Sequence, residues 1–356
     1  MDLGFLTDRL GDATSAGLAG LLVGGLFGAS AQRSRFCLRA ATIEVGRREP
    51  GERLAVWLVC FAVALVGTQL LLALGEVDGG SVRVLGTRGS LSGAILGGAM
   101  FGFGMVLARG CPSRLLVLTG QGNLRSLLSG LVFAVAAQAS LVGILSPVRN
   151  ALAAAWTIDG QLLDIAATTG GGRLAGVVLA LLWLVPAFIL VWRRRLVGIR
   201  LAGAIGAGLA IVGGWWVTYG LTLASFDPLP VKSVTFSGPS AHALMVFLGP
   251  PERLIDFDTG LIAGVFAGSF SAAYAAGELK LEGFEGGLSM RRYLFGALMM
   301  GFGAMLAGGC AVGSVSNAVV LSTIGWVALV SMWAAAMLAD RLFDQGTSSA
   351  TVRSAV

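Results

Sequence analysis

Residues 102–111 read GFGMVLARGC, and residues 301–310 read GFGAMLAGGC. Seven of the ten positions are identical, so the segment that ends at Cys111 recurs 199 positions later and ends at Cys310. Both copies belong to apolar runs, and both place glycines close together. Small residues let helix backbones approach one another within a bilayer. The repeat therefore predicts a tightly packed membrane helix, present twice, that ends at a thiol.

The composition of the whole chain is that of a membrane protein. Hydrophobic residues make up 56% and charged residues 12% of the 356 residues, and the mean hydropathy is +0.83. Soluble domains contain about 25% charged residues. A spanning helix needs about 20 apolar residues, and transmembrane barrels show short alternating segments instead. Stretches without Asp, Glu, Lys or Arg cover 13–32, 54–75, 89–108, 126–148, 174–192, 201–226, 259–277 and 293–339.

These stretches predict an all-α polytopic membrane protein with about nine transmembrane helices in a single domain, 1–356. The expected spans are 13–32, 54–75, 90–108, 125–146, 173–192, 200–222, 258–277, 292–308 and 322–340. The segments 33–53 and 193–200 are rich in arginine, and basic loops stay in the cytoplasm. The N-terminus is then outside and the C-terminus is cytoplasmic. The proline-rich segment 222–257 is expected to be an extracytoplasmic loop with a short helix that dips toward the bundle.

A second, weaker repeat relates 17–37 to 260–280. The expected repeat units are thus about 17–37, 93–111, 260–280 and 296–310. Internal repeats are common in transporters, where they are often inverted and form a site at their interface. The nine-helix count inverts the Cys111 unit relative to the Cys310 unit. It does not invert the weaker pair, so either the count is wrong there or that repeat is coincidental.

Cysteine is the residue type most suggestive of a site. The four cysteines have no CxxC spacing and the chain has one histidine, His242, which argues against zinc, haem and thioredoxin-type sites. We therefore expect no metal and no cofactor. Cys60 lies in the middle of an apolar helix and is expected to be a packing residue. Cys37, Cys111 and Cys310 each end a glycine-rich unit, and these three are the candidate pathway residues.

Basic residues accompany these thiols. Pro112, Gly120, Gly122 and Gly313 disfavour a continuous helix after the repeated cysteines, and a broken helix at membrane depth presents N–H groups that attract anions. The candidate cations are Arg109 and Arg114 beside Cys111, Arg39 beside Cys37, and Lys280, which takes the place of Cys37 in the weaker repeat. The alternatives are an Arg114 or, less favoured because it adjoins the thiol, an Arg109 that reaches lipid phosphate, and a solvated Lys280 paired with a neighbouring glutamate.

Five stretches in order along the chain resemble the YeeE/YedE family of sulphur transport proteins. They are RSRFCLRAA (33–41), ARGCPSR (108–114), GPSAHALM (238–245), GVFAGSFSAAYAAGELK (264–280) and GGCAVGS (308–314). The resemblance covers nearly the whole chain. It implies a multi-pass protein of the bacterial inner membrane whose broken or re-entrant segments meet at the centre of an hourglass-like interior formed by internal repeats.

The resemblance also implies a function and a set of site residues. Better-understood members take up thiosulfate by way of cysteines on central loops, which by motif would be Cys37, Cys111 and Cys310 here. The implied partners are thiosulfate or a similar sulfur anion, membrane lipid, and a separate TusA-like sulfur-carrier protein, because the chain has no fused carrier. Nucleic acid is not expected. Other relatives are linked to selenium, so a selenium species is an alternative substrate.

Two other functions are compatible with the sequence. A membrane sulfurtransferase could form a persulfide on Cys111 or Cys310, but the chain shows no nearby general base for nucleophilic catalysis. A partner-recruiting subunit would leave the repeated cysteines unexplained. The chain has no GxxxxGK[ST] motif and so no expected ATP site. We therefore expect a transporter and not an enzyme.

Overall fold

In the computed structural model, nine helices occupy the nine segments expected to span the membrane. The structure describes residues 7, 9–86, 88–168, 172–225, 230–248, 256–283 and 287–344. The helices are α2 (Asp12–Ser34), α4 (Glu52–Leu74), α6 (Leu91–Leu107), α8 (Leu124–Leu141), α11 (Gly172–Arg194), α12 (Ile199–Ala224), α14 (Phe257–Ala275), α15 (Gly287–Ala307) and α17 (Thr323–Ala339). The all-α polytopic class is confirmed.

Hydropathy alone identifies eight spanning stretches within the described part of the chain. The helix outside this set is α14, which begins with Asp256 as its cap and Asp258 in its first turn. α14 is nevertheless part of the bundle, because it packs closely against α2. Three of the eight stretches are broken: Asp12–Gly46, Leu91–Gly120 and Ser289–Val319 each contain a long helix followed by a short one.

Short elements complete the chain. The short helices within the three broken stretches have nine residues each. They are α3 (Leu38–Gly46), α7 (Pro112–Gly120) and α16 (Ala311–Val319). The others are α5 (Arg83–Gly86), α9 (Ser146–Ala154), α10 (Ile165–Thr168), α13 (Ser237–Leu248), η1 (Gly79–Ser81), η2 (Gly160–Leu163) and the π-helix η4 (Asp340–Asp344). The strands β1 (Gly89–Ser90) and β2 (Thr157–Ile158) pair antiparallel, with Gly89 opposite Ile158. The predicted short helix in 222–257 is α13.

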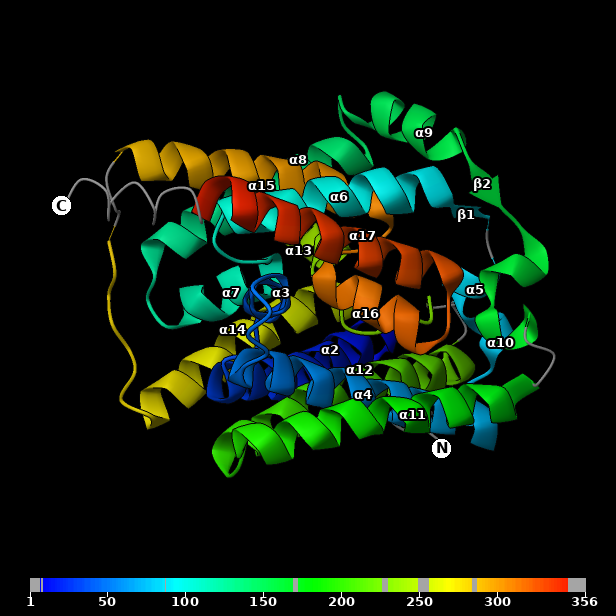
Figure 1. Cartoon of the computed structure of the whole chain (residues 1–356). Helices are drawn as coiled ribbons and strands as arrows, with labels where there is room; N and C mark the ends of the chain where they lie inside the picture. Colours follow the sequence, from blue (N-terminus) through cyan, green and yellow to red (C-terminus); the bar gives the residue numbers. More distant parts are fainter. Residues whose placement is uncertain are drawn as a thin grey trace.

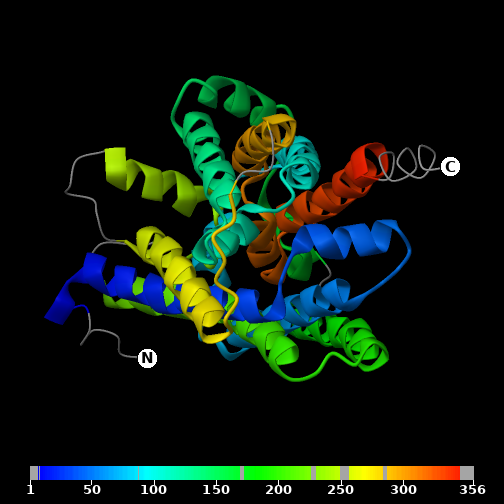
Figure 2. The same cartoon turned by 90° about the vertical axis from the view of Figure 1, so that its left-hand side faces the viewer.

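Glycines hold two pairs of long helices in backbone contact. A Cβ atom at Gly24 would lie 2.3 Å from the carbonyl oxygen of Leu261, and one at Gly268 would lie 2.2 Å from that of Gly25. Successive contacts advance along both helices, so α2 and α14 are parallel. Between α6 and α15 the order reverses, since Gly93 meets Leu306 whereas Gly104 meets the Gly296 carbonyl. These two helices, cyan and orange in Figure 2, are antiparallel, as the nine-helix count predicts.

The two ends of the bundle differ in charge. Residues 33–53 and 193–200 lie together at what we call the basic end, where Arg200 forms an ion pair with Glu52. In Figure 1 this end is on the left, with the end of α17 beside it, and the start of α2 lies toward the right. The described ends of the chain are therefore at opposite ends of the bundle. We call the right-hand end, which contains α5, α10 and the β1–β2 pair, the pocket end.

Candidate functional site

Each of the three candidate cysteines caps one of the nine-residue helices. Cys37 is the N-cap of α3, Cys111 of α7 and Cys310 of α16. Two residues before each cysteine the backbone is left-handed, at Arg35 (φ 55°), Arg109 (φ 56°) and Gly308 (φ 77°). This conformation is unusual for residues other than glycine, and strained backbone concentrates at functional sites. The same local fold thus places three thiols at three helix N-termini, where the helix dipole is positive.

The sequence correctly predicted the breaks but not all of their positions. Both repeated helices end before the cysteine, so that Ala108–Gly110 and Gly308–Gly309 form the turns. Gly120 ends α7, and Gly122 follows it at φ 100°. Gly313, by contrast, lies inside α16, so its expected role as a helix breaker is wrong. Instead, Gly313 leaves space for the Thr235 hydroxyl.

The structure brings the three capping thiols together and leaves the fourth apart. Cys111 has both Cys37 and Cys310 near it. Cys111 and Cys310 are each 1% exposed, Cys37 is half-buried, and all four cysteines are free thiols. Cys60 is buried within α4 among apolar side chains. Cys111 thus has both other capping thiols near it, and a shared pathway role for the three stays a prediction.

Arg114 is the predicted cation that belongs to this cluster. It lies in the first turn of α7 and interacts electrostatically with Cys37 and Cys111. Its Nη1 atom is buried and has no hydrogen-bond partner among the described residues. A buried polar group without a partner is costly, and guanidinium groups bind oxyanions through paired N–H donors. The arrangement leaves one strong anion-binding group unpaired next to two thiols.

The other predicted cations have different surroundings. Arg109 is exposed and lies 5.8 Å from the centre of the Tyr293 ring, which Arg125 also approaches at 4.7 Å. Arg39 forms an ion pair with Asp344 at 2.8 Å, so it holds α3 against η4.

Lys280 is also exposed, and its backbone N–H donates to the Gln121 carbonyl. Its neighbouring glutamates have other partners: Glu278 interacts with Gln32 and Arg35, and Glu282 accepts from Asn123. The proposed Lys280–glutamate pair therefore does not form. A pathway role for Arg109, Arg39 and Lys280 stays a prediction.

A cavity of about 590 Å³ opens at the pocket end and reaches the floor beside Cys310. Its described lining includes four cationic residues, Arg83, Arg88, Arg149 and Lys232, and no acidic one. Arg88 pairs with Asp159 and Lys232 with Asp258, both outside the lining. The Nε of Arg149 is buried without a described hydrogen-bond partner. A cavity lined by cations favours small anions. None of the four cationic lining residues was predicted from the sequence.

One wall of the cavity is the extended segment 231–236, which leads into α13. Ser233, Thr235 and Ser237 line the cavity, whereas the alternate residues Val234 and Phe236 are 0% exposed. Period-two alternation of polar and apolar residues is the signal of a half-buried extended segment. The sequence SVTFS (233–237) contains that signal, but it was included in a region interpreted as a loop.

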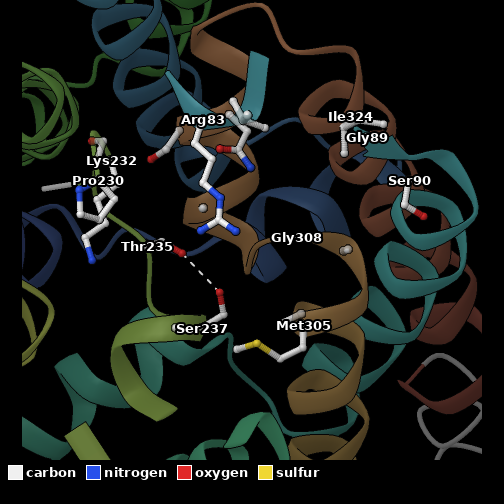
Figure 3. Close-up of a pocket in the computed structure, with 18 of the residues that line it drawn as sticks. Arg83, Gly89, Ser90, Pro230, Lys232, Thr235, Ser237, Met305, Gly308 and Ile324 are labelled. Carbon is white, nitrogen blue, oxygen red and sulfur yellow. Dashed lines mark hydrogen bonds between the residues drawn. The ribbon is translucent and has the colours of Figure 1, made fainter. Parts of the chain in front are cut away.

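The segment ends at Cys310. The backbone N–H of Phe236 donates to the Cys310 Sγ at 3.3 Å, and that of Gly313 donates at 3.5 Å. The Thr235 hydroxyl is 3.9 Å from the same sulfur and 3.3 Å from the Ser237 hydroxyl, a pair drawn in Figure 3. A Cβ atom at Gly313 would lie 2.4 Å from the Thr235 hydroxyl oxygen. Only glycine leaves this corner of the floor open.

One group of side chains has the composition of a metal site. His242, Asp256 and Asp258 place possible ligand atoms within 4.8 Å of one another. Asp256 caps α14 through Thr259 and lies 3.4 Å from His242, and Asp258 is 2.7 Å from Lys232. Each carboxylate thus has a partner within the protein, and Lys232 already supplies a positive charge.

Comparison with known proteins gives a consistent result. The family model for sulphur transport matches residues 33–338, which include all three capping cysteines. The thiosulfate transporter TsuA of Escherichia coli K12 is 26% identical over 341 residues, covering 90% of this chain and 94% of the relative. TsuA of Spirochaeta thermophila is 26% identical over 342 residues, covering 87% and 94%. The chain belongs to the YeeE/YedE family of sulphur transport proteins.

Proposed function

We propose that this protein carries thiosulfate, or a closely related small sulfur anion, across the inner membrane into the cytoplasm. The anion enters the cavity at the pocket end, reaches Cys310, and then passes Cys111, Cys37 and Arg114 toward the basic end. Two relatives named as thiosulfate transporters align over nearly the whole chain. Three capping thiols beside a buried, unpaired guanidinium support this function most directly.

Physical chemistry explains why such a site suits thiosulfate. The ion is a dianion with three hard oxygens and one soft terminal sulfur. Helix N-termini and arginines attract the charge, and neutral thiols are weak donors that contact sulfur without binding it tightly. Passage requires binding that is favourable enough for entry and weak enough for release. Several weak sites in sequence, at Cys310, Cys111 and Cys37, meet that requirement.

The charge of the loops supports an orientation of the protein in the membrane. Basic loops remain in the cytoplasm, so the basic end faces the cytoplasm and the cavity opens to the outside. The N-terminus is then extracytoplasmic and the C-terminus cytoplasmic. A separate TusA-like carrier would receive the sulfur at the basic end, and its consumption in the cytoplasm would draw transport forward.

Growth on thiosulfate as the only sulfur source tests the proposal in cells that lack their own thiosulfate transporters. The wild type should support growth, and Cys37→Ala, Cys111→Ala and Cys310→Ala should each impair it because each removes one thiol of the pathway. Cys60→Ala is the matched control, since it removes the same group from a buried position within α4, away from the three capping thiols. Membrane expression is measured for every variant.

Two outcomes would contradict the proposal. Growth that is equal in the wild type and all three variants would make the cysteines packing residues. Absence of growth with well-expressed wild type would assign the protein another sulfur or selenium species as its substrate.

A further inference from the structure

The wall of the cavity presents two hydroxyl groups that the fold does not use. Three neighbouring groups of the wall segment are engaged: Thr218 donates to the Lys232 carbonyl, Ser233 donates to the Ile211 carbonyl, and Ser316 donates to the Val234 carbonyl. These bonds fix the segment in place. For Thr235 and Ser237, the described hydroxyl contacts are the one they make with each other at 3.3 Å and that of Thr235 with Cys310.

Proton counting shows that this pair has an unused donor. Each hydroxyl has one proton to donate and two lone pairs that accept. The contact between Thr235 and Ser237 uses one of the two protons. The other is available to a ligand when the Cys310 thiol is the donor in its contact with Thr235. Both residues line the cavity, so the available O–H group faces the space through which an anion would pass.

The sulfur of Cys310 is constrained in a complementary way. Its lone pairs accept from the backbone N–H groups of Phe236 and Gly313. With both lone pairs used in this way, the sulfur can act only as the donor in its 3.9 Å contact with the Thr235 hydroxyl. The floor around the sulfur is formed by small residues, because Gly308 and Gly313 line the cavity there. Neither of these two positions carries a side chain.

Arg83 adds positive charge near the hydroxyl pair. It begins α5, and the adjacent Val82, which is 0% exposed, anchors that segment. Figure 3 shows the Arg83 guanidinium pointing toward the Thr235–Ser237 pair, with Gly308 and Met305 farther along the cavity. Guanidinium and hydroxyl groups are donors suited to oxyanions. The cavity thus has one region for hard oxygens and another for a soft atom.

We propose that Thr235 and Ser237, together with Arg83, bind the oxygen-bearing end of the anion and turn its terminal sulfur toward Cys310. The inference rests on the proposed function and deepens it. The substrate class that fits is a tetrahedral anion with an SO₃ head and one soft terminal atom, which is sulfur in thiosulfate and selenium in selenosulfate. Thr235 is then a specificity-determining residue, because it lies between the two regions.

Two substitutions at position 235 separate hydrogen bonding from packing. Thr235→Val keeps the shape of the side chain and removes the hydroxyl, whereas Thr235→Ser keeps the hydroxyl and removes the methyl group. The measurement is the KM for uptake of radiolabelled thiosulfate into proteoliposomes. We expect about a tenfold higher KM for Thr235→Val, the loss of one hydrogen bond to a charged group, and a KM near wild type for Thr235→Ser.

Thr222→Val is the matched control, because its hydroxyl donates within α12 to the Thr218 carbonyl and is not part of the described lining. Its KM should not change. Ser237→Ala provides a second test if Thr235→Val does not reach the membrane, and it should raise the KM by a similar factor.

Inhibition by thiocyanate tests the orientation, since this anion has a soft sulfur and no SO₃ head. Thr235→Val should weaken inhibition by selenosulfate about tenfold and leave inhibition by thiocyanate unchanged. If thiocyanate does not inhibit the wild type, the oxygen-bearing end is required for binding, which also supports the proposal.

The proposal is overturned if Thr235→Val and Ser237→Ala transport thiosulfate with an unchanged KM, or if Thr235→Ser is the more damaged variant at that position. An equal loss of inhibition by selenosulfate and thiocyanate would also overturn it. In each case the wild type still transports thiosulfate, so the proposed function stands. Failure of the wild type to transport thiosulfate would refute the proposed function itself.

Discussion

Gly313→Ala tests the geometry of the cavity floor with the smallest possible change. Gly313 is the third residue of α16 and does not have a positive φ. Replacement of glycine by alanine inside a helix normally stabilises it by about 1 kcal/mol. Here the added Cβ would lie 2.4 Å from the Thr235 hydroxyl oxygen and 3.2 Å from its Cβ. The normal preference is therefore opposed by a steric clash.

The magnitude follows from what Thr235 must give up. The segment cannot retreat, because Ser316 bonds to Val234 and Phe236 bonds to Cys310. Thr235 has to rotate, which breaks its contact with Ser237 at about 0.5–1.5 kcal/mol and strains its rotamer by about 0.5–1.5 kcal/mol. The free energy of unfolding should therefore fall by about 1–3 kcal/mol. Because the rotated hydroxyl is also lost to the anion, the KM for thiosulfate should be about tenfold higher.

A double-mutant cycle distinguishes this clash from general damage. Thr235→Ala removes the oxygen that the new Cβ would meet, so adding Gly313→Ala to Thr235→Ala should raise the KM no further. The assay is initial uptake of radiolabelled thiosulfate into proteoliposomes, with the Tm of each purified variant as a control. Additive effects of the two substitutions, or a Gly313→Ala variant with wild-type KM, would show that a clash with Thr235 does not limit binding.

Two further predictions concern the buried cation and the helix contacts. Arg114→Gln should lower thiosulfate uptake at least about tenfold, because a buried contact between the guanidinium and the oxyanion is lost. The control Arg193→Gln, at the exposed end of α11, should leave uptake unchanged. Equal effects of the two substitutions would contradict a site at Arg114. Gly264→Ala should lower the free energy of unfolding by about 1–3 kcal/mol, because its Cβ would lie 2.3 Å from the Leu21 carbonyl oxygen. Gly130→Ala should raise the free energy of unfolding slightly, because a Cβ at Gly130 has open space. Thermal unfolding in detergent measures both, and the same sign for both would refute close packing of α2 on α14.

The sequence was informative wherever a feature repeats locally. Charge-free runs placed all nine long helices, because a bilayer requires about 20 apolar residues in succession. The repeated Gly-Cys ends identified Cys111 and Cys310, and the helix count gave the antiparallel arrangement of their helices. The helix count also left the two units of the weaker repeat in the same orientation, and the structure agrees, since α2 and α14 are parallel neighbours.

Features that depend on distant contacts could not be predicted in the same way. The cavity is assembled from segments near Arg83, Arg149, Thr235 and Gly308, which lie far apart in sequence. The partner of Arg39 is Asp344, 305 residues away. Hydropathy alone does not identify α14 as a spanning helix. Its place in the bundle depends on glycine contacts with α2 and not on its own composition.

The most direct test of the pathway is thiosulfate uptake by purified protein in which only the middle thiol is changed. Initial uptake of radiolabelled thiosulfate into proteoliposomes is compared for the wild type, Cys111→Ala and the buried control Cys60→Ala. We predict that Cys111→Ala loses most of the uptake, because one thiol of the proposed route is then missing, while Cys60→Ala keeps the wild-type rate. Equal rates for all three proteins would contradict a route along the capping cysteines.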